Sequence, residues 1–322
     1  MYALFRSFAC LFVLGLSAPL FAQPYPARPV HIIVPFPPSG AADLLTRALG
    51  KKLSESWGQP VIADNRPGAG GNIGAEAAAK AAPDGYTLFM AAVTTHAVSM
   101  SLYSKLGYDI EKDLVAVSLV ANVPHILVTN PSLPAKNLVE LIAYLKAQDG
   151  KVNFASQGNG TLSHLEYELM RSMGGFKANH IPYKGSAPAM IDLLAGTVTV
   201  FFDSIPSSLP QVRAGKLRGI AVASSRRSPV LPDLPTLDES GLKGFTADSW
   251  FGIMAPAGTS REIVAKLNAD VIKGLDSQEV KDIISRQGGL IMGSSPEIMA
   301  AQIRGDREKW GRVVRESGAK IE

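Results

Sequence analysis

Cysteine is almost absent from this sequence. Its 322 residues include a single cysteine, Cys10, so no disulfide can form within the chain. Charged residues make up only 19% of the sequence, whereas hydrophobic residues make up 46%. Stability must therefore come from burial of apolar surface. Because a chain of this length exceeds the size at which one core usually divides, we expect two lobes.

Clusters of basic residues are also lacking. The net charge is +4, but the longest basic runs are pairs such as Lys51-Lys52 and Arg226-Arg227, with no interleaved aromatic residues. Nucleic-acid binding is therefore not expected. The mild positive charge can at most help to attract small anions.

The motifs of enzymes and metal sites are missing as well. The histidines show no metal-ligand spacing on one helix, and the sequence contains no Gly-x-Ser-x-Gly elbow. The glycine-rich stretch 66–74 does not fit a nucleotide loop, because Ile73 occupies the place of the third glycine and no Lys-Ser/Thr follows. We interpret this stretch as a structural turn. We expect no metal, no cofactor and no enzymatic activity.

The first 22 residues resemble an export signal. Arg6 is their only charged residue, residues 8–16 are almost wholly apolar, and small residues surround a plausible cleavage site after Ala22. The alternative is an N-terminal membrane anchor, although the apolar run is short for a bilayer. No second long apolar stretch follows, so we expect an exported, periplasmic protein that is soluble after signal cleavage.

Short apolar runs alternate with helical periodicity along the rest of the chain. Ten runs are predicted as strands: 30–34, 61–63, 86–92, 115–120, 125–129, 152–155, 178–181, 198–202, 217–223 and 250–255. Leucines recur at helical spacing between several of them, as in 44–53 and 138–145. The alternation is typical of α/β proteins with mainly parallel sheets flanked by helices.

The chain is expected to cross between the two lobes twice. One crossing lies in the apolar stretch 121–129, which Pro124 interrupts. The other lies in 223–255, where several prolines indicate an extended surface connection. The predicted division is a signal peptide at 1–22, a discontinuous first lobe at 23–124 plus 249–322, and a second lobe at 125–248.

Two similar strand-to-helix junctions are the most informative feature of the chain. In the first, prolines on both sides of Phe36 hold the chain extended before it turns into a helix. Unpaired amides and the helix dipole at such a start favour an anion, and Asp43 can pair with Arg47 one turn later. The candidate binding residues here are Phe36, Ser39, Gly40, Ala41, Ala42 and Asp43. The alternative is a plain turn with a capped helix.

The second junction is rich in small residues. Thr161 is expected to cap its helix, which would leave other amides of the loop free for a ligand. His164 follows in the first helical turn, and it could instead be a core histidine or one that orients the loop. The candidate binding residues are Ser156, Gly158, Gly160, Thr161 and His164.

Further candidates follow other strands. Ligands of open α/β sheets bind beyond the carboxyl ends of strands, which points to Thr94 and His96 after the strand at 86–92 and to Asp203 after the strand at 198–202. Tyr183 precedes a third strand-to-helix junction and is expected to line the cleft. Because Asp203 would repel an anion, we expect it to act through water or to orient other groups.

Several segments, taken together, resemble the substrate-binding proteins of tripartite tricarboxylate transporters, the TctC or Bug-type receptors. The resemblance covers 25–321. The segments that carry it are Asp64-Asn-Arg-Pro-Gly-Ala-Gly-Gly-Asn-Ile-Gly74, Pro83-Asp-Gly-Tyr-Thr-Leu88, His180-Ile-Pro-Tyr-Lys-Gly185, Asp192-Leu-Leu-Ala-Gly196, Gly215-Lys-Leu-Arg218, Leu231-Pro-Asp-Leu-Pro-Thr236 and Ser249-Trp-Phe-Gly252.

The resemblance implies a periplasmic binding protein of type II, whose two α/β lobes close on a small carboxylate, usually without an arginine clamp. It implies that the loops matching 36–43 and 156–161 hold one carboxylate through amides, hydroxyls and bridging waters. Two positions depart from the family pattern: Ser39 replaces a glycine and Ala42 replaces a hydroxyl residue. Both departures bear on which ligand is bound.

We therefore predict a receptor that binds a small organic acid between its lobes and delivers it to the membrane subunits of a transporter. We expect a monomer that contacts those subunits transiently. One alternative is a receptor that senses the ligand for a signalling partner. A more remote alternative is a hydrolase or isomerase that uses His164 or Asp203.

Overall fold

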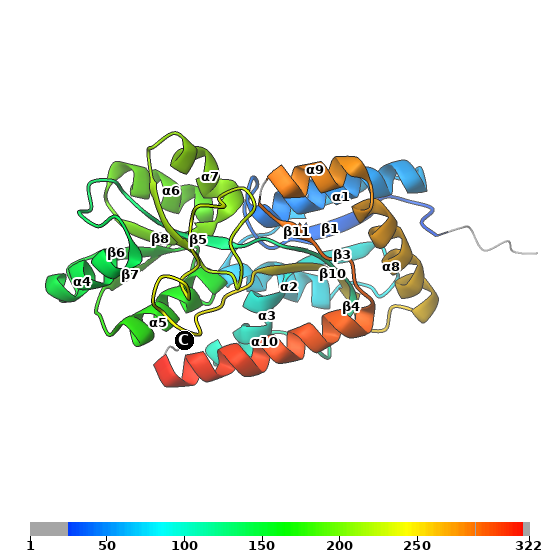
Figure 1. The fold of residues 1–322 in the computed structure, drawn as a ribbon. Coiled ribbons are helices and arrows are strands. Elements are labelled where there is room, and N and C mark those ends of the chain that lie inside the picture. The colour runs from blue at the N-terminus through cyan, green and yellow to red at the C-terminus, as the bar shows by residue number, and fades with distance from the viewer. Residues whose placement is uncertain (1–24, 287, 318–322) are drawn as a thin grey trace, which may run out of the picture.

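Two groups of strands and helices lie side by side, one built from both ends of the chain and the other from its middle (Figure 1). The computed structural model describes residues 25–286 and 288–317. The predicted signal peptide at 1–22 lies outside the described residues.

The first group contains a six-stranded sheet in the order β11-β4-β10-β3-β1-β2. Its strands are β1 (Val30–Val34), β2 (Val61–Asn65), β3 (Thr87–Ala92), β4 (Leu114–Asn122), β10 (Trp250–Pro256) and β11 (Leu290–Ile291). β1 pairs in parallel with β2 and β3, whereas β10 runs antiparallel to both β3 and β4. Successive residues Ile32 and Ile33 point to opposite faces, and both are buried because helices cover both faces.

The helices of this group are α1 (Ala41–Trp57), η1 (Ala69–Gly71), α2 (Asn72–Ala79), α3 (Val93–Leu102), α8 (Arg261–Leu275), α9 (Gln278–Arg286) and α10 (Pro296–Ser317). α1, α8 and α9 pack on the face that carries Ile32. α2, α3 and the start of α10 pack on the face that carries Ile33.

The second group contains a five-stranded sheet in the order β7-β6-β8-β5-β9. Its strands are β5 (His125–Thr129), β6 (Asn153–Ser156), β7 (Asn179–Pro182), β8 (Val200–Ser204) and β9 (Arg218–Val222). β6 is parallel to β7 and β8, whereas β5 is antiparallel to β8 and β9. The helices are α4 (Leu138–Gln148), α5 (Leu162–Gly174), α6 (Ser186–Ala195) and α7 (Ile205–Arg213).

The ten predicted strands correspond to β1–β10, with ends that differ by at most two residues. β11 was not predicted, because two residues are too few to show a pattern. The sequence also did not indicate that β5 and β10 run antiparallel to their neighbours. A short apolar run shows that a strand is buried, but it carries no information on direction.

Two segments connect the groups. Val123 and Pro124 join β4 directly to β5, and residues 223–249 join β9 to β10. The expectation of an extended surface connection is wrong in part for the second segment, since Leu237 and Phe245 are buried in the core of the second group. Prolines indicate where regular hydrogen bonding stops, but they do not determine whether an extended chain packs inward.

The C-terminal helix α10 contacts both groups. It runs along α3 and reaches α5 (Figure 1). Met299, near its start, packs into the core of the first group, whereas Trp310 and Val314, near its end, pack into the core of the second. None of the helices in the described part of the chain has the length and apolar character needed to cross a bilayer.

Candidate functional site

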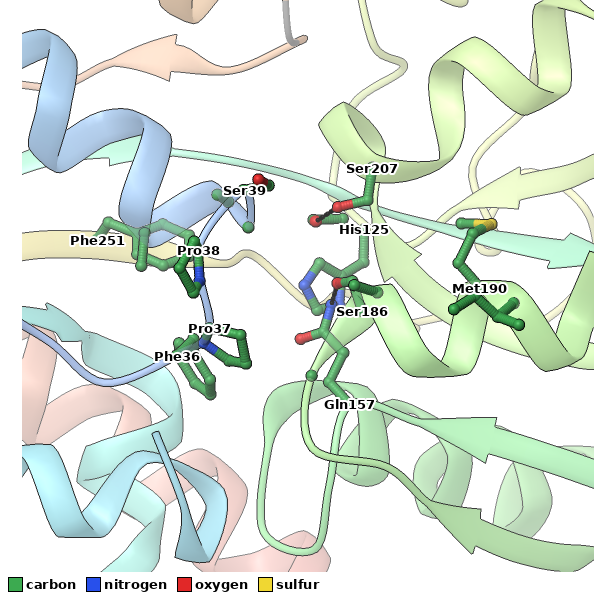
Figure 2. Close-up of a pocket in the computed structure, with 17 residues that line it drawn as sticks. Phe36, Pro37, Pro38, Ser39, His125, Gln157, Ser186, Met190, Ser207 and Phe251 are labelled. Carbon is green, nitrogen blue, oxygen red and sulfur yellow. Dashed lines mark hydrogen bonds between the residues drawn. The ribbon is translucent and has the colours of Figure 1, made fainter. Parts of the chain in front are cut away.

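A cavity of about 350 Å³ lies between the two groups, and side chains from both line it (Figure 2). The lining residues are Phe36, Pro37, Pro38, Ser39, Gly40, Ala41, Ala42, His125, Gln157, Gly185, Ser186, Ala187, Met190, Ile191, Ser204, Ser207 and Phe251. These described lining residues include no lysine, arginine, aspartate or glutamate. Any positive potential in the cavity must therefore come from other groups.

The start of α1 forms one side of the cavity. Ser39 turns the chain with a φ of 70°, and Gly40 is the N-cap residue of the helix. The amides of Gly40, Ala41 and Ala42 donate to no group among the described residues. This start therefore presents free N–H donors at the positive end of a helix dipole, as the sequence predicted for this loop.

Asp43 shapes this loop and does not line the cavity. Its carboxylate accepts hydrogen bonds of 3.0 Å from the Ser39 amide, from Arg47 Nε and from Asn65 Nδ2. Burial alone would raise the pKa of Asp43, but these donors outweigh burial and lower it. The carboxylate is therefore ionised, and protein groups already occupy it.

The starts of α6 and α7 lie across the cavity from α1. Figure 2 shows Ser186 and Ser207 facing the segment that carries Ser39. Gly185, with a φ of 108°, is the N-cap residue of α6. The amides of Ser186 and Ala187 donate to no described residue. Three helix dipoles thus end at one cavity whose described lining has no lysine or arginine, so the backbone supplies much of its attraction for anions.

Asp203 lies behind the lining and holds two polar side chains in place. It is completely buried, and its Oδ1 accepts hydrogen bonds from Gln157 Nε2 at 2.9 Å and from Ser186 Oγ at 2.6 Å. Its Oδ2 accepts a bond from Ser208 Oγ at 2.8 Å. Burial raises the pKa of Asp203, and the three donors oppose that rise. This arrangement fits the orienting role expected for Asp203.

His125 is the first residue of β5 and directly follows the first crossing. Its Nδ1 lies 2.7 Å from Oε2 of Glu166, and both side chains are buried. Burial alone would lower the pKa of His125, but the Glu166 carboxylate, with a further contribution from Asp203, raises it. His125 is the one residue with an ionisable side chain in the described lining.

The second predicted loop presents fewer free amides than expected. The amide of Gly158 donates to Ser156 Oγ at 3.2 Å, and the amide of Gly160 donates to His164 Nδ1 at 3.2 Å. The Thr161 hydroxyl donates to the Gly158 carbonyl and does not cap its helix. The structure corrects the expectation of free donors here, because small residues let the loop fold back onto its own side chains.

Gly158 and Tyr183 line a second cavity of about 380 Å³, which adjoins the first and shares Phe36 with it. The Tyr183 hydroxyl donates to Asp192 at 2.5 Å. Burial and the Asp192 carboxylate together raise the pKa of Tyr183 to about 12.

Thr94 and His96 lie in α3, which follows β3 without a loop. Thr94 Oγ1 donates to Asp306 at 2.7 Å, and His96 Nδ1 lies 2.8 Å from the Ala92 carbonyl. Both side chains are buried, and neither residue lines either of these cavities. The structure corrects the expectation that they face the cleft, because the immediate start of α3 turns them into the core.

Gln157, Ser207 and His125 line the cavity, and the sequence did not single them out. Gln157 lies within the second predicted loop, and Ser207 lies one turn beyond Asp203, so both were near a signal. His125 had no sequence signal beyond its place after Pro124.

The described residues contain no group of three or more His, Cys, Asp or Glu side chains that could hold a metal.

A family model described as "Tripartite tricarboxylate transporter family receptor" matches residues 45–319. The chain is similar to Protein BugT of Bordetella pertussis, with 44% identity over 308 residues, which cover 95% of this chain and 94% of that protein. It is similar in structure to R. palustris Rpa4515 with adipate, with a TM-score of 0.89, 36% identity, and coverage of 92% of this chain and 100% of that one. MatC from Rhodopseudomonas palustris with bound malate gives a TM-score of 0.86 and 34% identity, covering 90% of this chain and 100% of that one.

Proposed function

The chain belongs to the receptor family of the tripartite tricarboxylate transporters and has the two-lobed fold of periplasmic binding proteins of type II, and on this premise we propose that it binds a small organic carboxylate in the cavity between its sheets. In this role the exported protein works in the periplasm. It passes its ligand, chemically unchanged, to the membrane subunits of a transporter.

The observation that carries the proposal is the meeting of three helix starts at one cavity. A hydrogen bond to a charged group contributes roughly 1.5–3 kcal/mol, and a helix end adds about 0.3–1 kcal/mol. Three or four such bonds give roughly 5–12 kcal/mol, a range that includes the roughly 8 kcal/mol of a micromolar complex before ordering costs are subtracted. The free amides of α1 and α6 can therefore hold a carboxylate without a basic side chain.

The apolar part of the lining supports a ligand with a carbon chain. Phe36 and Phe251 lie on the side of α1, and Met190 lies on the side of α6 (Figure 2). Ile191, also on α6, lines the same cavity. The two solved relatives named above hold adipate and malate, which are both dicarboxylates with short chains. We infer that this protein takes a ligand of the same class.

We also infer that the two groups are lobes that close on the ligand, with the division at 23–124 plus 249–322 and at 125–248. In support, side chains of both groups line one cavity, and individual hydrogen bonds join the groups around it. The Leu162 amide donates to Thr95 Oγ1 at 3.2 Å, and the Tyr103 hydroxyl donates to the Asn159 carbonyl at 3.1 Å. A ligand that touches both sides of the cavity favours the closed state.

A panel of monocarboxylates, dicarboxylates and tricarboxylates tests the proposal by thermal shift, followed by calorimetry. We expect at least one member to bind the wild-type protein and to be recovered unaltered after incubation, as judged by mass spectrometry. Gly40→Leu should weaken that binding about tenfold or more, because the added side chain stands at the free amides of α1.

Gly305→Leu is the matched control, because Gly305 on α10 has open space around the position of a Cβ atom. It should leave the dissociation constant unchanged. Failure of every carboxylate to bind the folded wild-type protein would contradict the proposal. So would equal binding by the Gly40→Leu and Gly305→Leu variants.

A further inference from the structure

We propose that His125 donates a hydrogen bond from Nε2 to the bound carboxylate, and that the ligand therefore binds more tightly while the His125–Glu166 pair carries its proton. The inference rests on the proposed function and deepens it. It assigns a residue that recognises the ligand and couples ligand binding to the uptake of a proton.

The geometry leaves one nitrogen of His125 for the cavity. Nδ1 is held 2.7 Å from Glu166 Oε2, so the orientation of the ring is set by a buried partner. Nε2 has no hydrogen bond to any described residue. The ring stands in the lining beside Gln157 and Ser186 (Figure 2). A ligand oxygen that reaches this part of the cavity meets Nε2.

The charge of the protonated pair does not depend on where the shared proton lies. If the proton is on His125, an imidazolium faces a Glu166 carboxylate. If it is on Glu166, a neutral imidazole faces a carboxylic acid. Both arrangements have no net charge, and in both of them Nε2 carries a hydrogen that points away from Glu166. The protonated pair is thus a donor in either case.

Loss of that proton reverses the role of Nε2. The imidazole then donates through Nδ1 to the ionised Glu166, and Nε2 offers a lone pair to the ligand carboxylate, which repels it. The pair also acquires a buried negative charge. Every ionisable group that acts on it from neighbouring elements is acidic, namely Asp203 on β8 and Asp248 before β10. Glu166 Oε1 has no hydrogen-bond partner among the described residues, so no other donor compensates that charge.

The rest of the lining cannot produce this effect. Its other polar groups are the amides of the helix starts, the Gln157 carboxamide and serine hydroxyls, and none of these changes its charge near neutral pH. A dependence of binding on one proton therefore points to the pair or to Asp203 behind the lining, and a variant of the pair distinguishes them.

Calorimetric titration of the wild-type protein with adipate between about pH 6 and about pH 9 tests the inference, since adipate itself stays ionised in this range. L-malate replaces adipate if it binds more tightly in the panel. We expect the dissociation constant to rise about tenfold per pH unit above the pKa of the pair. Titrations in two buffers of different ionisation enthalpy should show proton uptake that approaches one proton per ligand.

The double variant H125Q/E166Q removes both ionisable groups and keeps an amide pair of similar size. We expect weaker binding, by roughly tenfold or more, and a dissociation constant that no longer changes with pH. H31Q is the matched control, because His31 on β1 is exposed, and it should behave as the wild-type protein does. Urea unfolding shows whether each variant folds. If the double variant does not fold, the proton uptake of the wild-type protein on ligand binding is the test of the inference.

The two proposals fail separately. If no carboxylate binds the wild-type protein at any pH, the proposed function falls, and the role of His125 falls with it. If carboxylates bind with a constant affinity and no proton uptake, only the role of His125 is overturned. Wild-type pH dependence that persists in H125Q/E166Q also overturns it.

Discussion

Two histidines of this protein, the buried His96 and the half-buried His180, are held neutral. Burial lowers the pKa of His96 to about 4, and burial together with the neighbouring His164 lowers the pKa of His180 to about 3. The His96 ring is packed edge-on against Phe89 at a centroid distance of 5.0 Å. The His180 ring stacks on His164 at 4.2 Å. The surroundings of both rings favour the uncharged form.

We predict that stability falls as the pH drops from about 6.5 to about 4. In this window the unfolded chain binds a proton at His96 whereas the folded chain does not, so acid favours unfolding. The loss due to His96 is about 3 kcal/mol, from about 1.4 kcal/mol per pKa unit. Urea unfolding of His96→Asn should show a shallower pH dependence than the wild-type protein, with His31→Gln as the control. An unchanged slope would contradict this account.

The sequence predicts part of the site at the level of residues. Ser39 and Gly40 line the cavity as expected, because the chemistry of a helix start is local and can be recognised in a short segment. Gln157 and His125 could not be found in this way. Their positions depend on Asp203 and Glu166, which are distant in sequence, and a short segment carries no information about such partners.

At the level of elements, the protein has several helix starts between its sheets, and only some present free donors. The start of α5 has its amides occupied by Ser156 and His164, and by Thr95 of the other group. The start of α6 keeps those of Ser186 and Ala187 free. Ser156 and His164 belong to the α5 junction itself and Thr95 to another segment, so the sequence shows that such bonds can form but not that they do.

We predict that a substitution at the α5 start changes mainly stability, whereas one at the α6 start changes mainly carboxylate affinity. Gly160→Ala should lower the free energy of unfolding by about 1–2 kcal/mol, because Gly160 has a φ of 76°, and should change carboxylate affinity less than about twofold. Ala187→Leu should weaken the same ligand about tenfold with little change in stability. Calorimetry and urea unfolding of both variants measure this. The reverse pattern would place the ligand at α5.

At the scale of the whole molecule, α10 connects the two groups. The alternation of strands and helices predicts two α/β units, and the two sheets agree with that. The path of α10 was not predictable, because an amphipathic helix shows that one face is buried but not which core covers it. Trp310 is 1% exposed and packs with residues of the second group, although β10 and α8 before it belong to the first.

We predict that Trp310→Ala lowers the free energy of unfolding by about 3–5 kcal/mol, the usual loss for a large buried aromatic side chain. The control is Ile298→Ala on the same helix, where the side chain is 58% exposed and the change should stay within about 0.5 kcal/mol. Urea unfolding followed by far-UV circular dichroism, which reports on the backbone and not on tryptophan, measures the stability of both variants. Equal stability of the two variants would mean that the end of α10 does not bind the second group in solution.

The central claim is that helix starts from both lobes hold the carboxylate of the ligand. A crystal structure of the protein with the tightest-binding carboxylate of the panel tests this most directly. We predict carboxylate oxygens within about 3.2 Å of the Ala41 or Ala42 amide on one side and of the Ser186 or Ala187 amide on the other. A carboxylate bound at the α5 start, or paired with a lysine or arginine outside this cavity, would contradict the account.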